Sequence, residues 1–151
     1  MSGFVIRPFR DADMAALLDV WEASWRATYP EIDFADRRDW FTGHFAALRA
    51  AGAEVFTAEH GSAFAGFVTV NSATNDIDQL AVAPAHFGGG LGALLMEKAR
   101  AVSPLRLTLK VNQSNARALR FYEREGFARV GEGVNAQSGR AYWEMEWKKV
   151  Y

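Results

Sequence analysis

The sequence predicts one α+β domain of about seven strands and about four helices. Its 151 residues, half of them hydrophobic, suit a single domain with a substantial core, so we assign residues 1–151 to one unit. Some segments repeat apolar residues every three or four positions, whereas others are short runs of β-branched and aromatic residues. These two patterns alternate along the chain, which predicts both helices and strands.

The N-terminal third predicts one strand followed by two helices. Residues 4–9 form a short apolar run that contains a proline, which is typical of an opening strand. Residues 11–13 can cap a helix that Pro30 ends. Residues 33–51 repeat aromatic residues at helical spacing, and Gly52 is suited to the C-cap. Both helices therefore precede most of the sheet.

The middle of the chain predicts three strands, a helix and a further strand. Residues 54–59 and 63–70 are separated by His-Gly-Ser and indicate a hairpin. A third strand is expected at residues 77–82, and apolar spacing predicts a helix over residues 91–102. Residues 105–111 follow as the next strand.

The C-terminal part predicts one helix and two closing strands. Ser114 or Asn115 caps the helix, and Gly126 ends it. The strands are expected at residues 127–130 and 142–147, with a polar loop over residues 131–139 between them.

Composition disfavours several classes of partner. Lys and Arg number 17 against 18 Asp and Glu, without a basic stripe, so we expect no nucleic acid partner. The chain has no cysteine, and its three histidines lack a metal-ligand spacing, so we expect no metal. It lacks an apolar run of the ~20 residues needed to cross a bilayer and a signal-like start, so we expect no membrane partner and a cytoplasmic location.

A glycine run is the most informative segment. The strand expected at residues 77–82 leads into Gly88, Gly89, Gly90 and Gly92, where a helix begins. Unpaired N–H groups and the positive dipole end of a helix favour a phosphate there, and glycines let it approach the backbone. The alternative is a tight turn without a ligand.

Two other phosphate motifs fit this run less well. A P-loop requires Gly-Lys-Ser/Thr, and no lysine follows within the run. Gly88, Gly90 and Ala93 match a dinucleotide fingerprint, but the next strand offers Arg106 and Lys110 instead of the acidic residue that this motif requires.

A second motif lies on the helix after residue 114. Asn115 and Tyr122 are seven positions apart, so they share one helix face at roughly 10 Å along its axis. One extended ligand could contact both. The alternative is a capping asparagine and a core aromatic residue.

Together, the glycine run and the Asn115–Phe127 segment resemble the GNAT superfamily of N-acetyltransferases over most of the chain. The resemblance implies a GNAT-like fold with a mixed, mostly antiparallel central sheet. It also implies acetyl-CoA as cosubstrate, no metal, and transfer of the acetyl group to a primary amine of a small molecule or peptide by direct attack.

The resemblance also assigns cofactor-binding residues. The loop amides would bind the pyrophosphate, with contributions from Phe87, Gly88, Gly89, Gly90, Leu91, Gly92 and Ala93. Phe87 stands where the family has Gln or Arg, so the contact of that polar side chain is lost. Leu80, Ala81 and Val82 would lie along the pantetheine arm, with strand amides polarising the acetyl carbonyl.

Asn115 would bond the same arm, and Tyr122 matches the general acid that protonates the departing thiolate. An ordinary tyrosine has a pKa of ~10 and a thiol one of ~8.5, so a strong hydrogen bond without full proton transfer could suffice.

The general base is left open among several candidates. Asp78 ranks first because it lies on the strand beside the expected acetyl group, followed by Asp76 and Glu144. A chain of water molecules is the alternative. Lys110 stands where relatives of the ribosomal-protein N-terminal acetyltransferases have a glutamate, which disfavours that subfamily.

The acceptor is expected to bind at the first two helices. Trp25 and Tyr29, with Trp40 near Glu22 and Glu31, would form an aromatic wall with carboxylates that suits a cationic amine. The alternative is an aromatic core. Two other functions stay open: a catalytically weak acyl-CoA sensor, because of Phe87 and the unidentified base, and an interaction domain that forms a homodimer.

Overall fold

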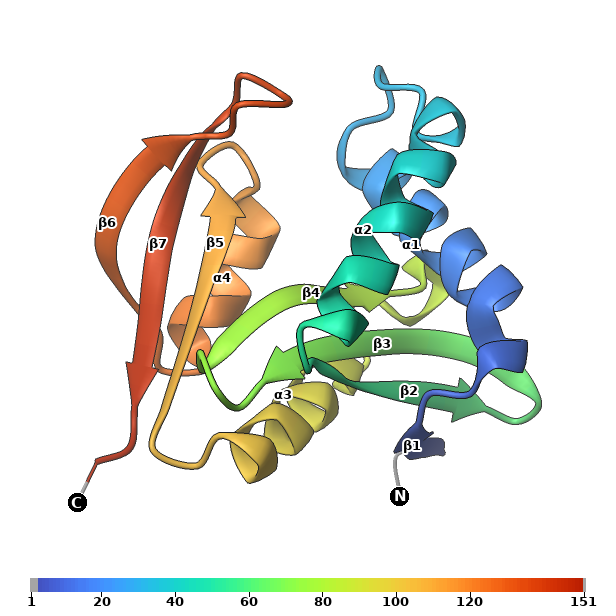
Figure 1. The fold of residues 1–151 in the computed structure, drawn as a ribbon, viewed down its shortest axis with the longest axis horizontal. Helices are drawn as coiled ribbons and strands as arrows, with labels where there is room; N and C mark the ends of the chain where they lie inside the picture. Colours follow the sequence, from blue (N-terminus) through green and yellow to red (C-terminus); the bar gives the residue numbers. More distant parts are fainter. Residues whose placement is uncertain (1–2, 151) are drawn as a thin grey trace.

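A computed structural model describes residues 3–150 as one seven-stranded sheet with helices on both faces (Figure 1). The strands are β1 (Phe4–Pro8), β2 (Glu54–His60), β3 (Ala63–Asn71), β4 (Asp76–Val82), β5 (Arg106–Asn112), β6 (Ala128–Val134) and β7 (Ala141–Lys148). The helices are α1 (Met14–Thr28), α2 (Arg38–Ala50), α3 (Leu91–Val102) and α4 (Ala116–Arg124), with short 3-10 turns η1 (Asp11–Asp13), η2 (Ala35–Arg37) and η3 (Pro84–His86). The predicted α+β class is confirmed.

The sheet consists of two arms that meet between β4 and β5. Its order is β1-β2-β3-β4-β5-β7-β6, and every neighbouring pair is antiparallel except β4 and β5, which are parallel. Their register covers only Asp76 with Thr108 and Ile77 with Leu109. Beyond these pairs the two strands diverge, as Figure 1 shows. We call the divergence of the two strand backbones beyond these pairs the β4–β5 opening.

A bulge in β4 lies where this divergence begins. Leu80 pairs with Val68 and Ile77 with Val70, so Asp78 and Gln79 together oppose the single residue Thr69. The backbone N–H of Gln79 donates to Thr69 Oγ1 at 3.0 Å. Such a bulge bends its strand and increases the local twist, which turns β4 away from β5.

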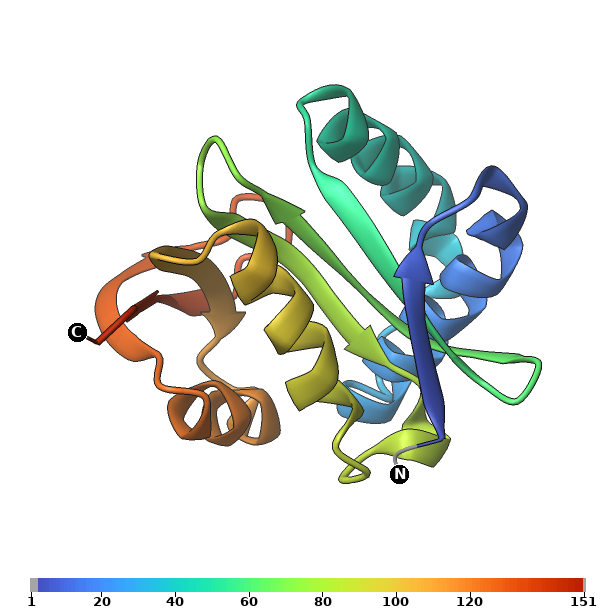
Figure 2. The ribbon, with the colours of Figure 1, turned by 90° about the horizontal axis from the view of Figure 1, so that it is seen from below.

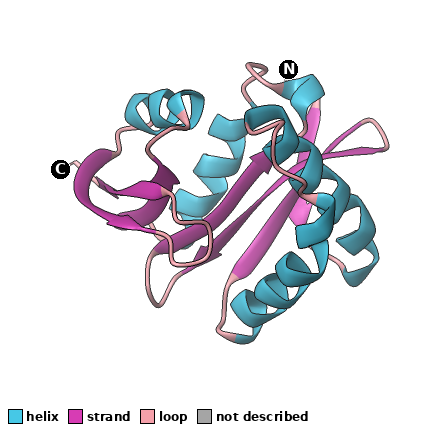
Figure 3. Ribbon diagram, turned by 90° about the horizontal axis from the view of Figure 1, so that it is seen from above, coloured by secondary structure: helices cyan, strands magenta, loops and turns pink. Residues whose placement is uncertain are grey.

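Two apolar cores lie on opposite faces of the sheet. One contains α3 and α4, with fully buried Leu95, Met96, Leu107 and Met145. The other joins α1 and α2 to β3 and β4. Figures 2 and 3 show these helices on the two sides of the strands.

The structure corrects two predicted boundaries, and the first is the end of β6. Strand β6 continues to Val134, so the first part of the predicted 131–139 loop is strand. Gly131 and Gly133 lie opposite Glu144 and Tyr142, and a Cβ on each glycine would meet those side chains at 2.9 and 2.5 Å. The glycines therefore make room for β7 side chains and do not form a turn.

The helix predicted over residues 33–51 also begins later than expected. Its first part is the turn η2, and α2 starts at Arg38. Over residues 3–150, no helix has the length and apolar character needed to span a membrane.

Candidate functional site

The glycine run forms an open loop between η3 and α3. Gly88 and Gly90 have φ values of 76° and 86°, the left-handed region that favours glycine. A Cβ added to either would meet nothing within 4 Å, so the backbone of both residues is accessible to a ligand. Gly92 differs, because its Cβ would lie 2.9 Å from Phe121 Cε1. Gly92 is therefore needed for close packing of α3 on α4.

Several N–H groups of this loop are available to a ligand. Phe87 and Gly89 donate to the carbonyl oxygens of Pro84 and His86 in η3, at 3.2 and 3.1 Å. In the part of the chain that the structure describes, the N–H groups of Gly88, Gly90 and Leu91 bond no protein acceptor. They lie at the start of α3, where the helix dipole favours an anion.

The edge of β4 adds a second row of N–H donors. Gln79 and Ala83 donate toward β3, to Thr69 Oγ1 at 3.0 Å and to the Ala65 carbonyl at 2.7 Å. Backbone direction alternates along a strand, so the N–H groups of Leu80 and Val82 face the β4–β5 opening. Ala81 has its side chain in the α1–α2 core and is 5% exposed.

Helix α4 places Asn115 and Tyr122 as the sequence predicted, on one helix. Asn115 is the N-cap, and its Oδ1 accepts a hydrogen bond from the Ala118 N–H at 3.2 Å. The Tyr122 ring packs against Phe121 and Phe127 and is 9% exposed.

The Tyr122 hydroxyl forms no hydrogen bond within residues 3–150. It is also absent from the fully buried unpartnered atoms of this segment, which are Arg100 Nε and Ser103 Oγ. The hydroxyl is therefore not sealed inside the core. Burial of the ring raises the pKa of Tyr122 to about 12, so the phenol stays protonated at neutral pH.

Asp78 has a partner that the sequence analysis missed. His44 Nε2, on α2, lies 2.7 Å from Asp78 Oδ1, and the Gln79 amide donates to the same oxygen at 2.7 Å. The His44 ring stacks on Trp40 with centroids 4.9 Å apart. The pair is 34 positions apart in sequence, so no local spacing could have revealed it.

Asp76 and Lys110 lie on the same face of the sheet as Asp78. Burial raises the pKa of Asp76, and the charge of Asp78 raises it further, whereas Thr108 and Lys110 lower it. Lys110 pairs with Glu144 in the β5–β7 register. Carboxylates and one ammonium group thus line the sheet beside the β4–β5 opening.

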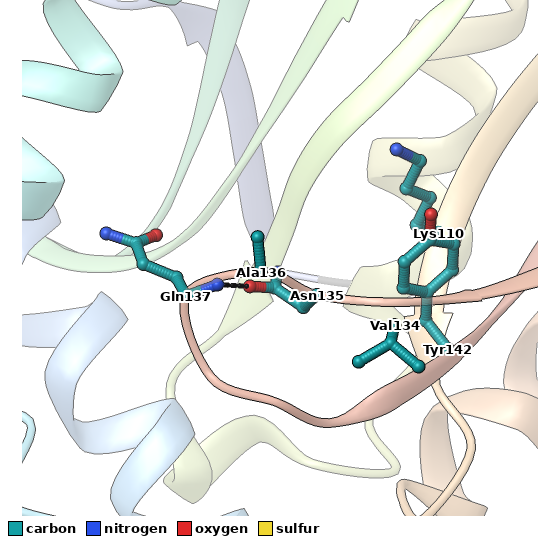
Figure 4. Close-up of a pocket in the computed structure, with 6 residues that line it drawn as sticks. All are labelled: Lys110, Val134, Asn135, Ala136, Gln137 and Tyr142. Atoms are coloured by element: carbon teal, nitrogen blue, oxygen red, sulfur yellow. Dashed lines mark hydrogen bonds between the residues drawn. The ribbon is translucent and has the colours of Figure 1, made fainter.

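An open pocket of about 470 Å³ lies beside this polar face, under the β6–β7 loop (Figure 4). Its lining residues are Lys110, Val134, Asn135, Ala136, Gln137 and Tyr142. The Lys110 Nζ lies 5.0 Å from the Tyr142 ring centroid. The polar loop segment gave no sequence signal for this pocket, because the pocket depends on how the loop folds over β5.

Trp25 and Tyr29 stack together with ring centroids 5.9 Å apart. The Tyr29 hydroxyl lies 2.7 Å from Ser114 Oγ, and the Arg140 guanidinium carbon lies 4.2 Å from the Tyr29 ring centroid. Tyr29 therefore joins α1 to the loops before α4 and β7. Trp40 stacks on His44 instead and forms no ring contact with this pair within the described chain.

The carboxylates expected beside this aromatic pair are partly neutralised by arginines. Glu22 pairs with Arg26 and Arg38, at 2.7 and 3.1 Å. Glu31 lies 3.6 Å from Arg140. Within residues 3–150, no three His, Cys, Asp or Glu side chains come together in a way that could hold a metal ion.

This chain is similar to known proteins in both sequence and fold. Residues 14–127 match the model of the Acetyltransferase (GNAT) family. The fold is similar to that of apo YjaB from Escherichia coli, with 26% identity, a TM-score of 0.74, and coverage of 95% of this chain and 97% of that one.

Two further solved structures are similar in fold and were determined with a ligand. PaiA N-acetyltransferase from Thermoplasma acidophilum, in complex with coenzyme A, gives 19% identity and a TM-score of 0.77, covering 97% of this chain and 99% of that one. YncA, a putative acetyltransferase from Salmonella typhimurium with acetyl-CoA, gives 20% identity and a TM-score of 0.68, covering 97% and 94%. With the family match spanning most of its length, the chain belongs to the acetyltransferase (GNAT) family.

Proposed function

We propose that this chain transfers an acetyl group from acetyl-CoA to a primary amine of a small molecule or peptide by direct attack. One observation carries the proposal: the N–H groups of Leu80 and Val82, which face away from β3, are followed along the chain by those of Gly88 and Gly90, which bond no acceptor within residues 3–150. An extended ligand with amides at one end and a diphosphate at the other matches this arrangement. PaiA and YncA, with the same fold, were solved with coenzyme A and acetyl-CoA.

Acetyl-CoA supplies an activated thioester. The loop N–H groups hold the diphosphate, and the open space at Gly88 and Gly90 allows it to approach the backbone. Leu80 and Val82 donate to the pantetheine arm and to the acetyl carbonyl, where negative charge develops during attack. Asn115, the N-cap of α4, is the proposed side-chain contact to the arm.

Asp78 is the proposed base, and His44 is its partner. The amine must lose a proton as it attacks, and a carboxylate bonded to an imidazole at 2.7 Å can accept that proton and pass it on. Asp78 lies at the β4 bulge, next to the strand segment that faces the opening. This position supports Asp78 over Glu144, which lies on β7.

Tyr122 is the proposed donor to the departing thiolate. A pKa of about 12 lies ~3.5 units above that of an ordinary thiol, so complete proton transfer would cost about 5 kcal/mol. The phenol therefore acts by donating a hydrogen bond to the thiolate, and the proton that the thiol finally carries comes from solvent.

The acceptor is proposed to enter through the pocket of Figure 4 and the face that carries Trp25 and Tyr29. Beside the pocket, the carboxylates of Asp76, Asp78 and Glu144 outnumber the Lys110 ammonium, whereas the Arg140 guanidinium at Tyr29 lies 3.6 Å from Glu31. That balance favours an acceptor that arrives as a cation, as a primary amine does at neutral pH.

The test is release of free thiol from acetyl-CoA in the presence of a panel of primary amines. The panel includes polyamines, amino sugars and peptides with free N-termini, and mass spectrometry identifies the acetylated product. We expect amine-dependent thiol release and an acceptor heavier by one acetyl group. Binding of acetyl-CoA without transfer to any amine would instead support the catalytically weak sensor, and absence of binding would contradict both functions.

A further inference from the structure

Arg117 joins the glycine loop to α4 and α1. It lies in the first turn of α4, and its guanidinium carbon is 3.6 Å from the centroid of the Phe87 ring. Its Nη2 donates to Thr28 Oγ1, at the end of α1, at 3.0 Å. The guanidinium therefore lies over the ring of Phe87, the residue that begins the glycine loop.

This cation lacks a compensating anion in the part of the chain that the structure describes. Its contacts there are the Thr28 hydroxyl and the Phe87 ring, and neither carries a charge. Partial burial lowers the pKa of Arg117, which reflects the cost of removing the cation from water. Most of its five N–H donors remain free, and the unpaired N–H groups of Gly88 and Gly90 lie just after Phe87 in the chain.

We propose that Arg117 binds the diphosphate of acetyl-CoA, and that Phe87 positions it by stacking. The proposal rests on the proposed function and adds a side-chain cation to a loop that otherwise offers only backbone donors. A guanidinium presents a planar fork that matches two phosphate oxygens, and a ring on one face fixes the plane of that fork. Phe87 thus contributes to anion binding without a polar atom of its own.

The first experiment measures binding of CoA and dephospho-CoA by calorimetry to the wild type, Arg117→Gln and Arg124→Gln. Arg124 is the matched control, because it is also exposed, lies two turns along α4 and contacts no part of the loop. We expect Arg117→Gln to weaken both ligands by the same factor, about 10- to 100-fold, and Arg124→Gln to leave both affinities close to wild type.

The other outcomes overturn the proposal. If Arg117→Gln weakens CoA but not dephospho-CoA, Arg117 contacts the 3′-phosphate and not the diphosphate. If it leaves both affinities unchanged, or tightens them, Arg117 is a packing residue or covers the loop. Failure of the wild type to bind CoA would instead contradict the proposed function itself. Far-ultraviolet circular dichroism and the melting temperature of each unliganded variant establish that it is folded.

The second experiment tests the positioning role of Phe87 with a double-mutant cycle. We expect Phe87→Leu to lower the affinity for CoA and Phe87→Trp to keep most of it. In the Arg117→Gln background, Phe87→Leu should cause little further loss of affinity, since the stacked pair acts as one unit. Independent effects, in which the two losses multiply, would contradict positioning through the ring. A loss in Phe87→Trp as large as in Phe87→Leu would contradict it too.

Discussion

The Tyr122 phenol combines a buried ring with a hydroxyl that has no protein partner within residues 3–150. If this hydroxyl donates a hydrogen bond to the leaving thiolate, the bond forms only as charge develops on sulfur. Tyr122→Phe would therefore destabilise the transition state and leave the bound cofactor unaffected. We expect kcat to fall about 10- to 100-fold while the Kd for acetyl-CoA stays close to wild type. Steady-state thiol release and calorimetry measure the two values. An unchanged kcat would contradict the proposed role.

The raised pKa of Tyr122 also predicts how stability depends on pH, which can be measured without an acceptor amine. Its pKa rises from 10.0 to about 12 on folding, so its contribution is complete below pH 10 and is lost as the pH rises through the folded value. Between pH 8 and pH 11, the wild type should lose about 1 kcal/mol of unfolding free energy relative to Tyr122→Phe. Urea unfolding of both proteins at the two pH values gives this difference. A constant difference would mean that the phenol is solvated in the folded state.

Asp78 is separated from the other candidate bases by its hydrogen bond to His44. Asp78→Asn keeps the size of the side chain but cannot accept the proton, so we expect kcat to fall about 100-fold or more. His44→Gln should cause a smaller loss, because the carboxylate itself remains. The pH profile of kcat/KM provides a further check, since loss of the base removes its acidic limb. If Glu144→Gln causes the larger loss, Glu144 is the base.

At the scale of elements, the contact between α3 and α4 depends on Gly92. An added Cβ would lie 2.9 Å from Phe121 Cε1, so in Gly92→Ala either the Phe121 ring or one of the two helices must shift. We expect a loss of about 1–3 kcal/mol in the free energy of unfolding, measured in urea. Phe121→Leu in the same chain should recover part of it. A loss of acetyl-CoA affinity without a loss of stability would instead assign Gly92 to the ligand.

The sequence predicts elements whose ends are marked by cap residues. It does not predict features that depend on contacts between residues far apart in the chain. Asn115 and Gly126 are cap residues, so α4 could be placed from its own sequence. Gly131 resembles a turn residue, and only the Glu144 side chain across the sheet explains its place in β6. His44 contacts Asp78 only because α2 packs on the sheet. The glycine loop that we propose for the cofactor is therefore visible in the sequence, whereas the partner of the proposed base is not.

At the scale of the whole molecule, the two arms of the sheet share only two register pairs between β4 and β5. A ligand bound along β4, the glycine loop and α4 would connect both arms, and it should bind only the folded chain. At 100 times its Kd, acetyl-CoA should add about 2.7 kcal/mol of stability. For a domain of this size, we expect the melting temperature to rise by roughly 5–10 °C. S-acetyl-pantetheine, which lacks the diphosphate, should give a much smaller shift at the same concentration. Equal shifts would show that the loop amides contribute little to binding, and the absence of any shift with acetyl-CoA would contradict a site that spans the β4–β5 opening.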